Sequence, residues 1–170
     1  EIKSQLEEWA NYDSLTSIFN RRYGEHLLDT IQKDMCNEDN SCCVLLADID
    51  YFKTINDTHG HALGDKVLQQ VMHELSKNLR SKDTLIRWGG DEILIVLPSI
   101  KLDSALKMAD RLRTVIESCK FPRIEEVTMS FGVVTWKRKE LKTSVLRRAD
   151  EQLYLAKANG RNCIFPHSVP

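Results

Sequence analysis

The chain has 170 residues and a formal net charge of −1, and 42% of its residues are hydrophobic and 29% charged. This composition fits one globular domain whose core needs no disulfide or metal to stabilise it. The balanced charge excludes general binding to nucleic acid or to an anionic membrane, so any anion site must be local. No apolar run reaches the length of a membrane span, and the charged start is unlike a signal peptide.

The N-terminal segment carries Ile2, Leu6 and Trp9 at helical spacing on a charged background. This pattern predicts a short amphipathic helix that is too small to be stable alone. Because the chain does not begin with Met, we expect this helix to be the end of a linker from an upstream domain. The expected boundaries are 1–12 for the linker, 13–166 for the domain and 167–170 for a C-terminal tail.

Helical and strand-like patterns alternate through the rest of the chain. Helices are predicted at 21–34, 66–80, 101–118 and 141–160, strands at 42–50, 84–88, 92–98, 126–136 and 161–166, and a turn-rich connection with short helical pieces at 51–65. Gly160 is the expected stop of the last helix. The two central strands are joined so tightly that they must form an antiparallel hairpin. We therefore predict an α/β fold: a single-domain sandwich with a central mixed, mostly antiparallel five-stranded sheet flanked by helices.

The cysteines are odd in number and include no CxxC pair, which argues against a disulfide framework or a zinc site. They are Cys36, Cys42, Cys43, Cys119 and Cys163. We expect them to be buried reduced thiols in a cytoplasmic protein, because free cysteine packs as a small hydrophobe.

The stretch RWGGDEILIVLP, residues 87–98, places two glycines and two carboxylates at the tip of the predicted hairpin. Glycine reaches positive φ without steric cost and lets a ligand approach the backbone. Turn chemistry alone would explain Gly89 and Gly90. Asp91 and Glu92 favour a second interpretation, because a Mg²⁺ ion would relieve the repulsion between adjacent carboxylates.

Two further clusters suggest a phosphate-binding site. Asp48 and Asp50 lie two apart at a strand end, so they share a face, and Lys53 follows them. An acidic strand end beside an acidic hairpin can build a magnesium–triphosphate site, whereas solvated loop charges and Asx-turns are the alternative. Lys157 and Arg161 lie four apart at a helix end, where they could grip phosphate or simply favour the helix dipole.

Five ordered motifs resemble those of the GGDEF-domain diguanylate cyclases, over residues 13 to about 165. They are DSLTSIFNRR, DIDYFKTINDTHGHALGD, RWGGDEI, VTMSFGV and RRADEQLYLAKANGRN. The resemblance implies a fold related to nucleotidyl cyclases and polymerase palms, and condensation of two GTP molecules into cyclic di-GMP with release of two pyrophosphates. It also implies Mg²⁺ or Mn²⁺ as cofactor.

The resemblance assigns roles to individual residues. Asp48, Asp91, Glu92 and the Ile49 carbonyl are implied as metal ligands, and Asp91, supported by Glu92, as the catalytic acceptor of the 3′-hydroxyl proton. Phosphate contacts are implied for Lys53, Lys157 and Arg161, with the backbone near Phe52 and room left by Gly90. Guanine contacts are implied for Asn56 and Asp65, with His61 nearby. Guanine offers two donors on one edge, which a carboxylate such as Asp65 can pair with.

The resemblance further implies that two subunits must face each other, each supplying one GTP, so we expect a transient or stable homodimer. RSKD, residues 80–83, matches the family's RxxD product-inhibition site, with Arg80, Asp83 and Arg111 as its residues. A helix-end arginine followed by a capping aspartate is the alternative. We expect a cytoplasmic domain controlled by an upstream sensory domain, whereas membrane attachment cannot be read from this sequence.

The chain departs from the family pattern at three positions. Ile93 replaces the usual aromatic residue of the signature, Ser17 replaces a glycine of the first motif, and Phe131 stands where Ile is common. Ile93 should point into the core, and Ser17 should tilt the first loop. None of the three departures replaces a residue that the resemblance implies in metal or phosphate binding. The rival functions are a degenerate module that binds GTP or cyclic di-GMP as a regulator, and a cyclase that accepts ATP.

Overall fold

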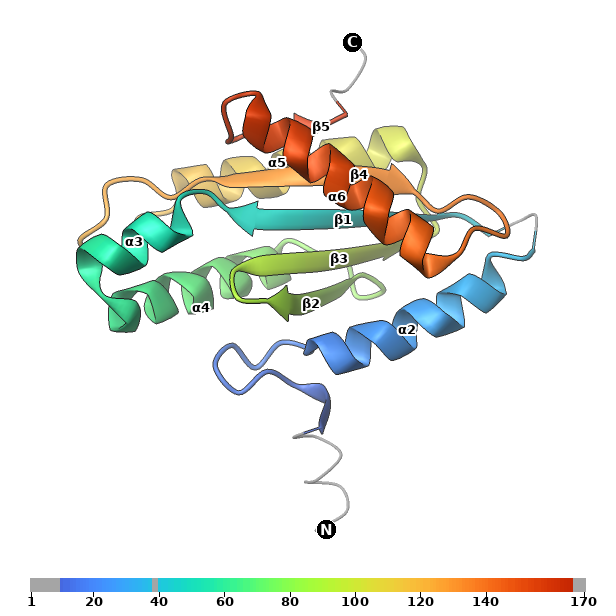
Figure 1. Ribbon diagram of the computed structural model, residues 1–170, viewed down its shortest axis with the longest axis horizontal. Coiled ribbons are helices and arrows are strands. Elements are labelled where there is room, and N and C mark those ends of the chain that lie inside the picture. Colours follow the sequence, from blue (N-terminus) through green and yellow to red (C-terminus); the bar gives the residue numbers. More distant parts are fainter. Residues whose placement is uncertain (1–9, 38–39, 167–170) are drawn as a thin grey trace.

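The computed structural model describes residues 10–37 and 40–166 (Figure 1). The helices are α2 (Arg21–Asp34), α3 (Phe52–His59), α4 (His61–Lys77), α5 (Leu102–Ser118) and α6 (Lys142–Ala158), and the strands are β1 (Cys42–Ile49), β2 (Thr84–Gly89), β3 (Glu92–Pro98), β4 (Met129–Thr135) and β5 (Ile164–Phe165). Most of the predicted linker helix, with Ile2, Leu6 and Trp9, lies outside the described residues, as does the tail at 167–170. Residues 10 and 11, which are described, are helical.

Several predicted ranges differ from the structure. The last strand, expected at 161–166, is only Ile164–Phe165, because Arg161 and Asn162 have positive φ, and the helix expected to end at 80 ends at Lys77. The helix expected from residue 66 begins at His61, because the connection before it is itself helical and forms α3 and the first turn of α4. The strand expected from residue 126 begins at Met129. These last two errors arise in polar stretches, where hydrophobic periodicity carries little information about local structure.

The five strands form one sheet in the order β2-β3-β1-β4-β5. β1 pairs antiparallel with β3 and β4, β2 pairs antiparallel with β3, and only β4 and β5 are parallel. The prediction of a mixed, mostly antiparallel five-stranded sheet is therefore confirmed. Because β1 is central and antiparallel to both neighbours, its C-terminal end lies beside the first residues of β3 and β4.

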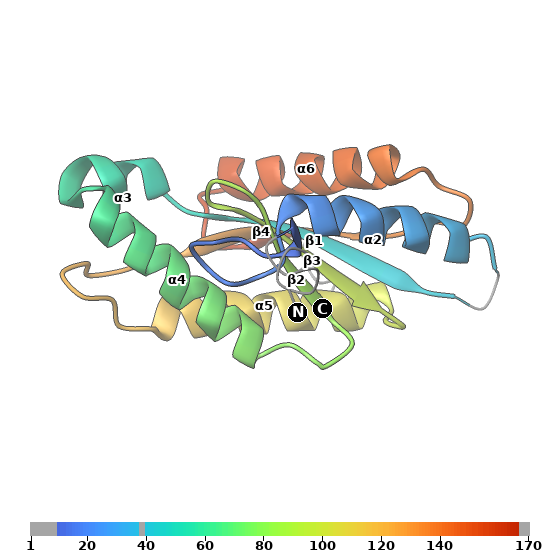
Figure 2. The same cartoon turned by 90° about the horizontal axis from the view of Figure 1, so that it is seen from below.

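Helices cover both faces of the sheet. Figure 2 shows α2 and α6 on one face and α4 and α5 on the other. Successive residues of β1 point to opposite faces, as a strand requires. Leu45 and Ala47 join the core under α4 and α5, whereas Val44 and Leu46 join the core under α2 and α6. This double coverage explains why β1 reads as a continuous apolar run rather than as an alternating one.

Two departures from the family pattern pack as expected from their apolar character. Ile93 and Phe131 are fully buried, which confirms that Ile93 points into the core. Ser17 has a φ of 58°, the left-handed region that glycine favours, so the serine carries a steric strain that glycine would avoid.

The cysteines are free thiols, but their burial was predicted correctly only in part. Cys42 and Cys43 are buried, and burial raises the pKa of Cys42 to about 12 and that of Cys43 to about 11. Cys119 and Cys163 are half-buried, and Cys36 is exposed because it lies beyond the end of α2. The prediction was therefore wrong for Cys36.

Gly132 of β4 allows α6 to lie directly against the sheet. A Cβ at this position would come within 2.4 Å of the Ala149 carbonyl oxygen and of the Leu153 backbone nitrogen. These backbone atoms cannot turn aside as a side chain could. We expect Gly132→Ala to lower the free energy of unfolding by about 1–3 kcal/mol, the usual cost of overpacking. Urea unfolding would measure the change, and an unaltered midpoint would contradict this close contact.

Candidate active site

The hairpin between β2 and β3 carries the Gly-Gly-Asp-Glu stretch. Gly89 pairs with Glu92, so Gly90 and Asp91 form the turn. Gly90 has a φ of 47°, which accounts for glycine at that position by turn geometry alone. A Cβ on either glycine would meet nothing within 4 Å, so open space surrounds both. This space is compatible with the predicted approach of a phosphate, which stays a prediction.

Asp48 lies near the end of β1, where strand pairing sets it opposite Glu92 of β3 and Ser130 of β4. Its Oδ2 accepts a hydrogen bond from Lys157 Nζ of α6. Its Oδ1 is buried and has no hydrogen-bond partner among residues 10–37 and 40–166. Burial, and next the Asp91 carboxyl within hydrogen-bonding reach, raise the pKa of Asp48 to about 7, although Lys157 opposes the rise.

Glu92 belongs to the same acidic corner. Burial raises its pKa first, and the negative charges of Asp48 and Asp150 raise it further. Two carboxyls with raised pKa values in adjacent strands mean that the fold holds negative charge where it is poorly solvated. Such a corner gains stability when a cation binds there.

The residues at this corner fit a divalent metal ion. Mg²⁺ prefers carboxylate and carbonyl oxygens, and Asp48 offers a buried acceptor that no other described residue satisfies. Among residues 10–37 and 40–166, no three His, Cys, Asp or Glu side chains form a metal-binding cluster. Asp48 and Asp91 are carboxyls within hydrogen-bonding reach of each other. The metal-binding roles of Asp48, Asp91, Glu92 and the Ile49 carbonyl stay predictions.

Two of the three cations predicted to bind phosphate, Lys157 and Arg161, lie at the same end of β1, and both have partners within the chain. Lys157 pairs with Asp48. Arg161 stacks on Tyr51, with its Cζ 4.5 Å from the ring centroid and its Nη1 3.5 Å from the hydroxyl. Tyr51 is 61% exposed and joins β1 to α3, so Arg161 is held beside the corner at its solvent side.

The predicted guanine and remaining phosphate contacts lie on the two helices that follow β1. Lys53 and Asn56 belong to α3, and His61 and Asp65 to α4. Lys53, His61 and Asp65 are exposed, and Phe52 packs against the core. Asn56 is half-buried, and its Oδ1 is a buried acceptor without a partner, as a residue that receives a donor from a ligand would be.

Asp50 has a structural role that the sequence did not reveal. Its carboxylate accepts hydrogen bonds from Thr128 Oγ1 at 2.7 Å, Ser130 Oγ at 2.7 Å and the Asn162 backbone N–H at 2.9 Å. A carboxylate with this many donors needs no metal ion. Asp50 therefore ties β1 to β4 and to the loop after α6, and it positions the segment that carries Arg161.

The predicted inhibitory residues form a second site, away from the hairpin tip. Arg80 Nη2 and Nε donate to Asp83 Oδ1 at 2.6 and 3.0 Å, and Nη2 also donates to the Pro98 carbonyl at 3.1 Å. The Asp83 side chain is fully buried and that of Arg80 is 33% exposed, so the pair is partly shielded from solvent. Asp83 Oδ2 accepts from the Arg80 backbone N–H as well, but α4 ends at Lys77, so Arg80 is not the helix-end arginine of the alternative reading.

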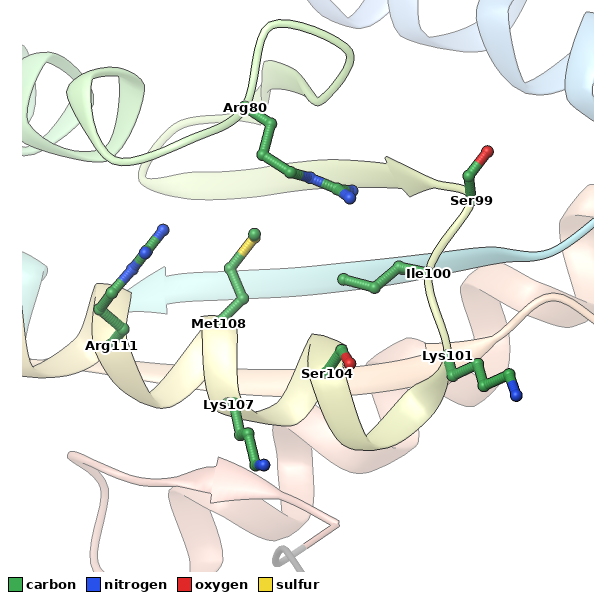
Figure 3. Close-up of a pocket in the computed structure, with 8 residues that line it drawn as sticks. All are labelled: Arg80, Ser99, Ile100, Lys101, Ser104, Lys107, Met108 and Arg111. Atoms are coloured by element: carbon green, nitrogen blue, oxygen red, sulfur yellow. The ribbon is translucent and has the colours of Figure 1, made fainter.

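Arg111 of α5 faces Arg80 across a cavity of about 600 Å³. Figure 3 shows both guanidinium groups reaching into the space between α5 and the loop before β2. Arg111 Nη2 donates to the Asn78 carbonyl at 2.6 Å. Lys101 and Lys107 also line this cavity, so it is a strongly positive one. Neither lysine was predicted, because a lysine on an amphipathic helix reads as an ordinary solvated residue.

Two residues beside the acidic corner of Asp48, Asp91 and Glu92 were not predicted from the sequence. Tyr51 was read as part of a loop, yet it supports Arg161. Arg87 was read as a strand residue, yet it bonds the hairpin tip and Asp13 of the N-terminal loop. The position of Arg87 three residues before Gly90 could have suggested the first contact, but no local pattern predicts the second.

No helix among the described residues is both long and apolar enough to cross a membrane.

Comparisons with known proteins agree with this architecture. The family model described as "Diguanylate cyclase, GGDEF domain" matches residues 10–163. The response regulator PleD of Caulobacter vibrioides is 39% identical over 92% of this chain, and the diguanylate cyclase DgcM of Escherichia coli is 35% identical over 96%. The matches cover only 36% of PleD and 40% of DgcM, so the chain spans well under half of these relatives.

Solved structures of GGDEF domains also superpose on this chain. The coiled coil and GGDEF domain of DgcB from Caulobacter crescentus, solved with c-di-GMP, superposes with a TM-score of 0.91 at 28% identity, covering 95% of this chain and 88% of that one. The diguanylate cyclase SiaD of Pseudomonas aeruginosa, solved with its activator SiaC, gives 0.88 at 32% identity, covering 96% and 64%. By its motifs, its palm-like sheet and these matches, the chain belongs to the GGDEF domain family.

Proposed function

We propose that this chain is a diguanylate cyclase domain that condenses two GTP molecules into cyclic di-GMP and releases two pyrophosphates. The observation that carries the proposal is the meeting of the Asp48 and Asp91 carboxyls at the ends of neighbouring strands, with Lys157 beside them. Such a corner suits a metal-bound triphosphate. The names of DgcM and of SiaD, and the c-di-GMP in the DgcB structure, support the same activity.

Mg²⁺, or Mn²⁺ in its place, would be held by Asp48 and Asp91, supported by Glu92 and the Ile49 carbonyl. When bound, the metal neutralises triphosphate charge and stabilises the attacking and leaving oxygens. Asp91 accepts the proton of the 3′-hydroxyl. Lys157, which pairs with Asp48, would be placed to contact phosphate.

The remaining substrate contacts come from the start of α3, from α4 and from the end of α6. Lys53 and Arg161 contact phosphate, with the backbone near Phe52, and Gly90 leaves the space that phosphate needs. Asn56 and Asp65 contact the guanine edge, with His61 near them. Asp65 accepts from N1–H and the exocyclic amine of guanine, a pair of donors that adenine lacks, so we expect GTP rather than ATP as the substrate.

Ring closure needs two copies of this domain, because each subunit binds one GTP and the 3′-hydroxyl of one must reach the α-phosphate of the other. Correct placement of two reactants is worth about 7–11 kcal/mol at best, so pairing dominates the rate. We propose a transient or stable homodimer in the cytoplasm, controlled by an upstream sensory domain. The DgcB structure contains a coiled coil together with its GGDEF domain, which supports a helical connection of this kind.

A turnover assay tests the proposal. The chain is incubated with GTP and Mg²⁺ over a range of protein concentrations, and the dinucleotide product is quantified. We expect cyclic di-GMP, with a rate that rises more steeply than linearly until the dimer is saturated. Tight nucleotide binding without product would support the regulatory module instead. Equal use of ATP in a competition assay would contradict the role of Asp65.

A further inference from the structure

Arg87 joins the hairpin tip to a distant part of the chain through a single guanidinium group. Its Nε donates to the Gly90 carbonyl at 2.9 Å, and its Nη1 donates to Asp13 Oδ1 and Oδ2 at 2.9 and 3.0 Å. The Arg87 and Asp13 side chains are only 21% and 19% exposed. A charge-assisted pair with this little solvent around it is stronger than an exposed one.

The contact with Gly90 fixes a peptide group of the proposed active site. The Gly90 carbonyl and the Asp91 N–H belong to the same planar peptide, so their directions are opposite and linked. When Arg87 holds the carbonyl, the Asp91 amide is turned away from Arg87. Gly90, with a φ of 47°, has no side chain to hinder rotation of this peptide, and open space surrounds it. The hydrogen bond from Arg87 thus fixes the orientation of the Gly90–Asp91 peptide, which the turn residues alone do not fix.

The contact with Asp13 links this peptide to the N-terminal loop, residues 13–20. Asp13 also accepts from the Thr16 N–H at 2.9 Å and from Thr16 Oγ1 at 2.7 Å, so it is held within that loop. The Arg87 N–H donates to the Phe19 carbonyl at 2.8 Å. The loop is joined to the helical residues before it, since Asn20 Nδ2 donates to the Ala10 carbonyl at 3.0 Å. A displacement of the residues before Asp13 would therefore be passed to Arg87 through these hydrogen bonds.

We propose that Arg87 is a positioning residue: it holds the Gly90–Asp91 peptide in its working orientation, and its pair with Asp13 makes that orientation depend on the N-terminal loop. Arg87 is not among the residues proposed to bind substrate or metal. Its effect on turnover rests on the proposed function, whereas its effect on the hairpin does not.

Arg148 offers a matched control. Its Nε and Nη2 bind Glu140 at 2.8 and 2.6 Å, and Nη2 also donates to the Thr135 carbonyl at 2.5 Å. It is 23% exposed and joins the beginning of α6 to the end of β4. Arg148→Ala thus removes the same kind of ion pair and carbonyl contact, without any bond to the hairpin.

The activity test compares turnover at saturating GTP, well below the melting temperature of each variant. We expect Arg87→Ala to lower kcat about 10- to 100-fold with little change in KM, as misplacement of a catalytic group does. Asp13→Asn should lower kcat less, and the double variant should be no worse than Arg87→Ala, because both act through one contact. Arg148→Ala should melt at a lower temperature yet keep its kcat within twofold. Equal kcat values for Arg87→Ala and Arg148→Ala would overturn the proposal.

A second test needs neither nucleotide nor metal. ¹⁵N relaxation of the Gly90 and Asp91 amides should show greater mobility in Arg87→Ala and in Asp13→Asn, and no change in Arg148→Ala. Unaltered relaxation in Arg87→Ala would overturn the inference even if the chain is an active cyclase. Absence of dinucleotide from the unmodified chain would instead count against the proposed function, while relaxation still decides the role of Arg87.

Discussion

Asp91→Ala is expected to lower cyclic di-GMP formation at least about a thousandfold, because one substitution removes the proposed proton acceptor and half of the carboxylate pair proposed to hold the metal. General base catalysis alone contributes about 10²- to 10⁴-fold, and the weaker metal site adds to that loss. Asp91→Asn should be nearly as inactive, since it keeps the size of the side chain and loses its charge. Quantifying the dinucleotide product would measure both losses.

A measurement of stability shows whether the loss of activity in Asp91→Ala comes from lost chemistry or from misfolding. Burial is the main cause of the raised pKa of Asp48 and the Asp91 carboxyl is the next, so removal of Asp91 lets that pKa fall part of the way towards its usual value. Above about pH 7 Asp48 carries a negative charge beside Asp91, and relief of the repulsion between them should leave the metal-free variant at least as stable as the parent. Thermal melting at pH 8 checks the sign. Exposed Asp34, at the end of α2, provides a control whose replacement by alanine should leave turnover unchanged. Full turnover in Asp91→Ala would refute the assigned site.

Arg80→Ala is expected to raise the cyclic di-GMP concentration needed for half-inhibition at least about a hundredfold. The guanidinium is held by Asp83 and the Pro98 carbonyl, so it is already oriented before a ligand binds. Each hydrogen bond from such a group to a charged phosphate is worth about 1.5–3 kcal/mol, and loss of two accounts for the expected change. The inhibition curve of each variant, relative to its own uninhibited rate, is the measurement.

The control for Arg80 is its neighbour Lys82, which is exposed in the same RSKD turn. Lys82→Ala removes the same charge from the same loop and should shift inhibition less than threefold. Asp83 keeps the Arg80 backbone N–H as a partner at 2.8 Å, so Arg80→Ala should remain folded. A variant that melts normally and keeps full sensitivity to the product would contradict the role of this cavity.

The sequence by itself determined the family, the order of the elements and the residue types of the site. These properties are encoded locally: period-2 and period-3.6 patterns mark strands and helices, and each motif carries its chemistry within a few residues. Ile93 illustrates this, because an apolar residue after two carboxylates in a strand must turn to the core. The early start of α4 at His61 was missed for the same reason, since a polar helical turn has no apolar period to detect.

Only the tertiary structure decided which of these residues meet. Strand register sets Asp48 opposite Glu92, and the docking of α6 brings Lys157 to Asp48. Asp50 resembles Asp48 in the sequence, yet three donors from β4 and from the loop after α6 make it structural. Arg87 meets Asp13 only because the N-terminal loop pairs with β2. Contacts between distant segments depend on register and on how helices pack against the sheet, and no local pattern in the sequence records either.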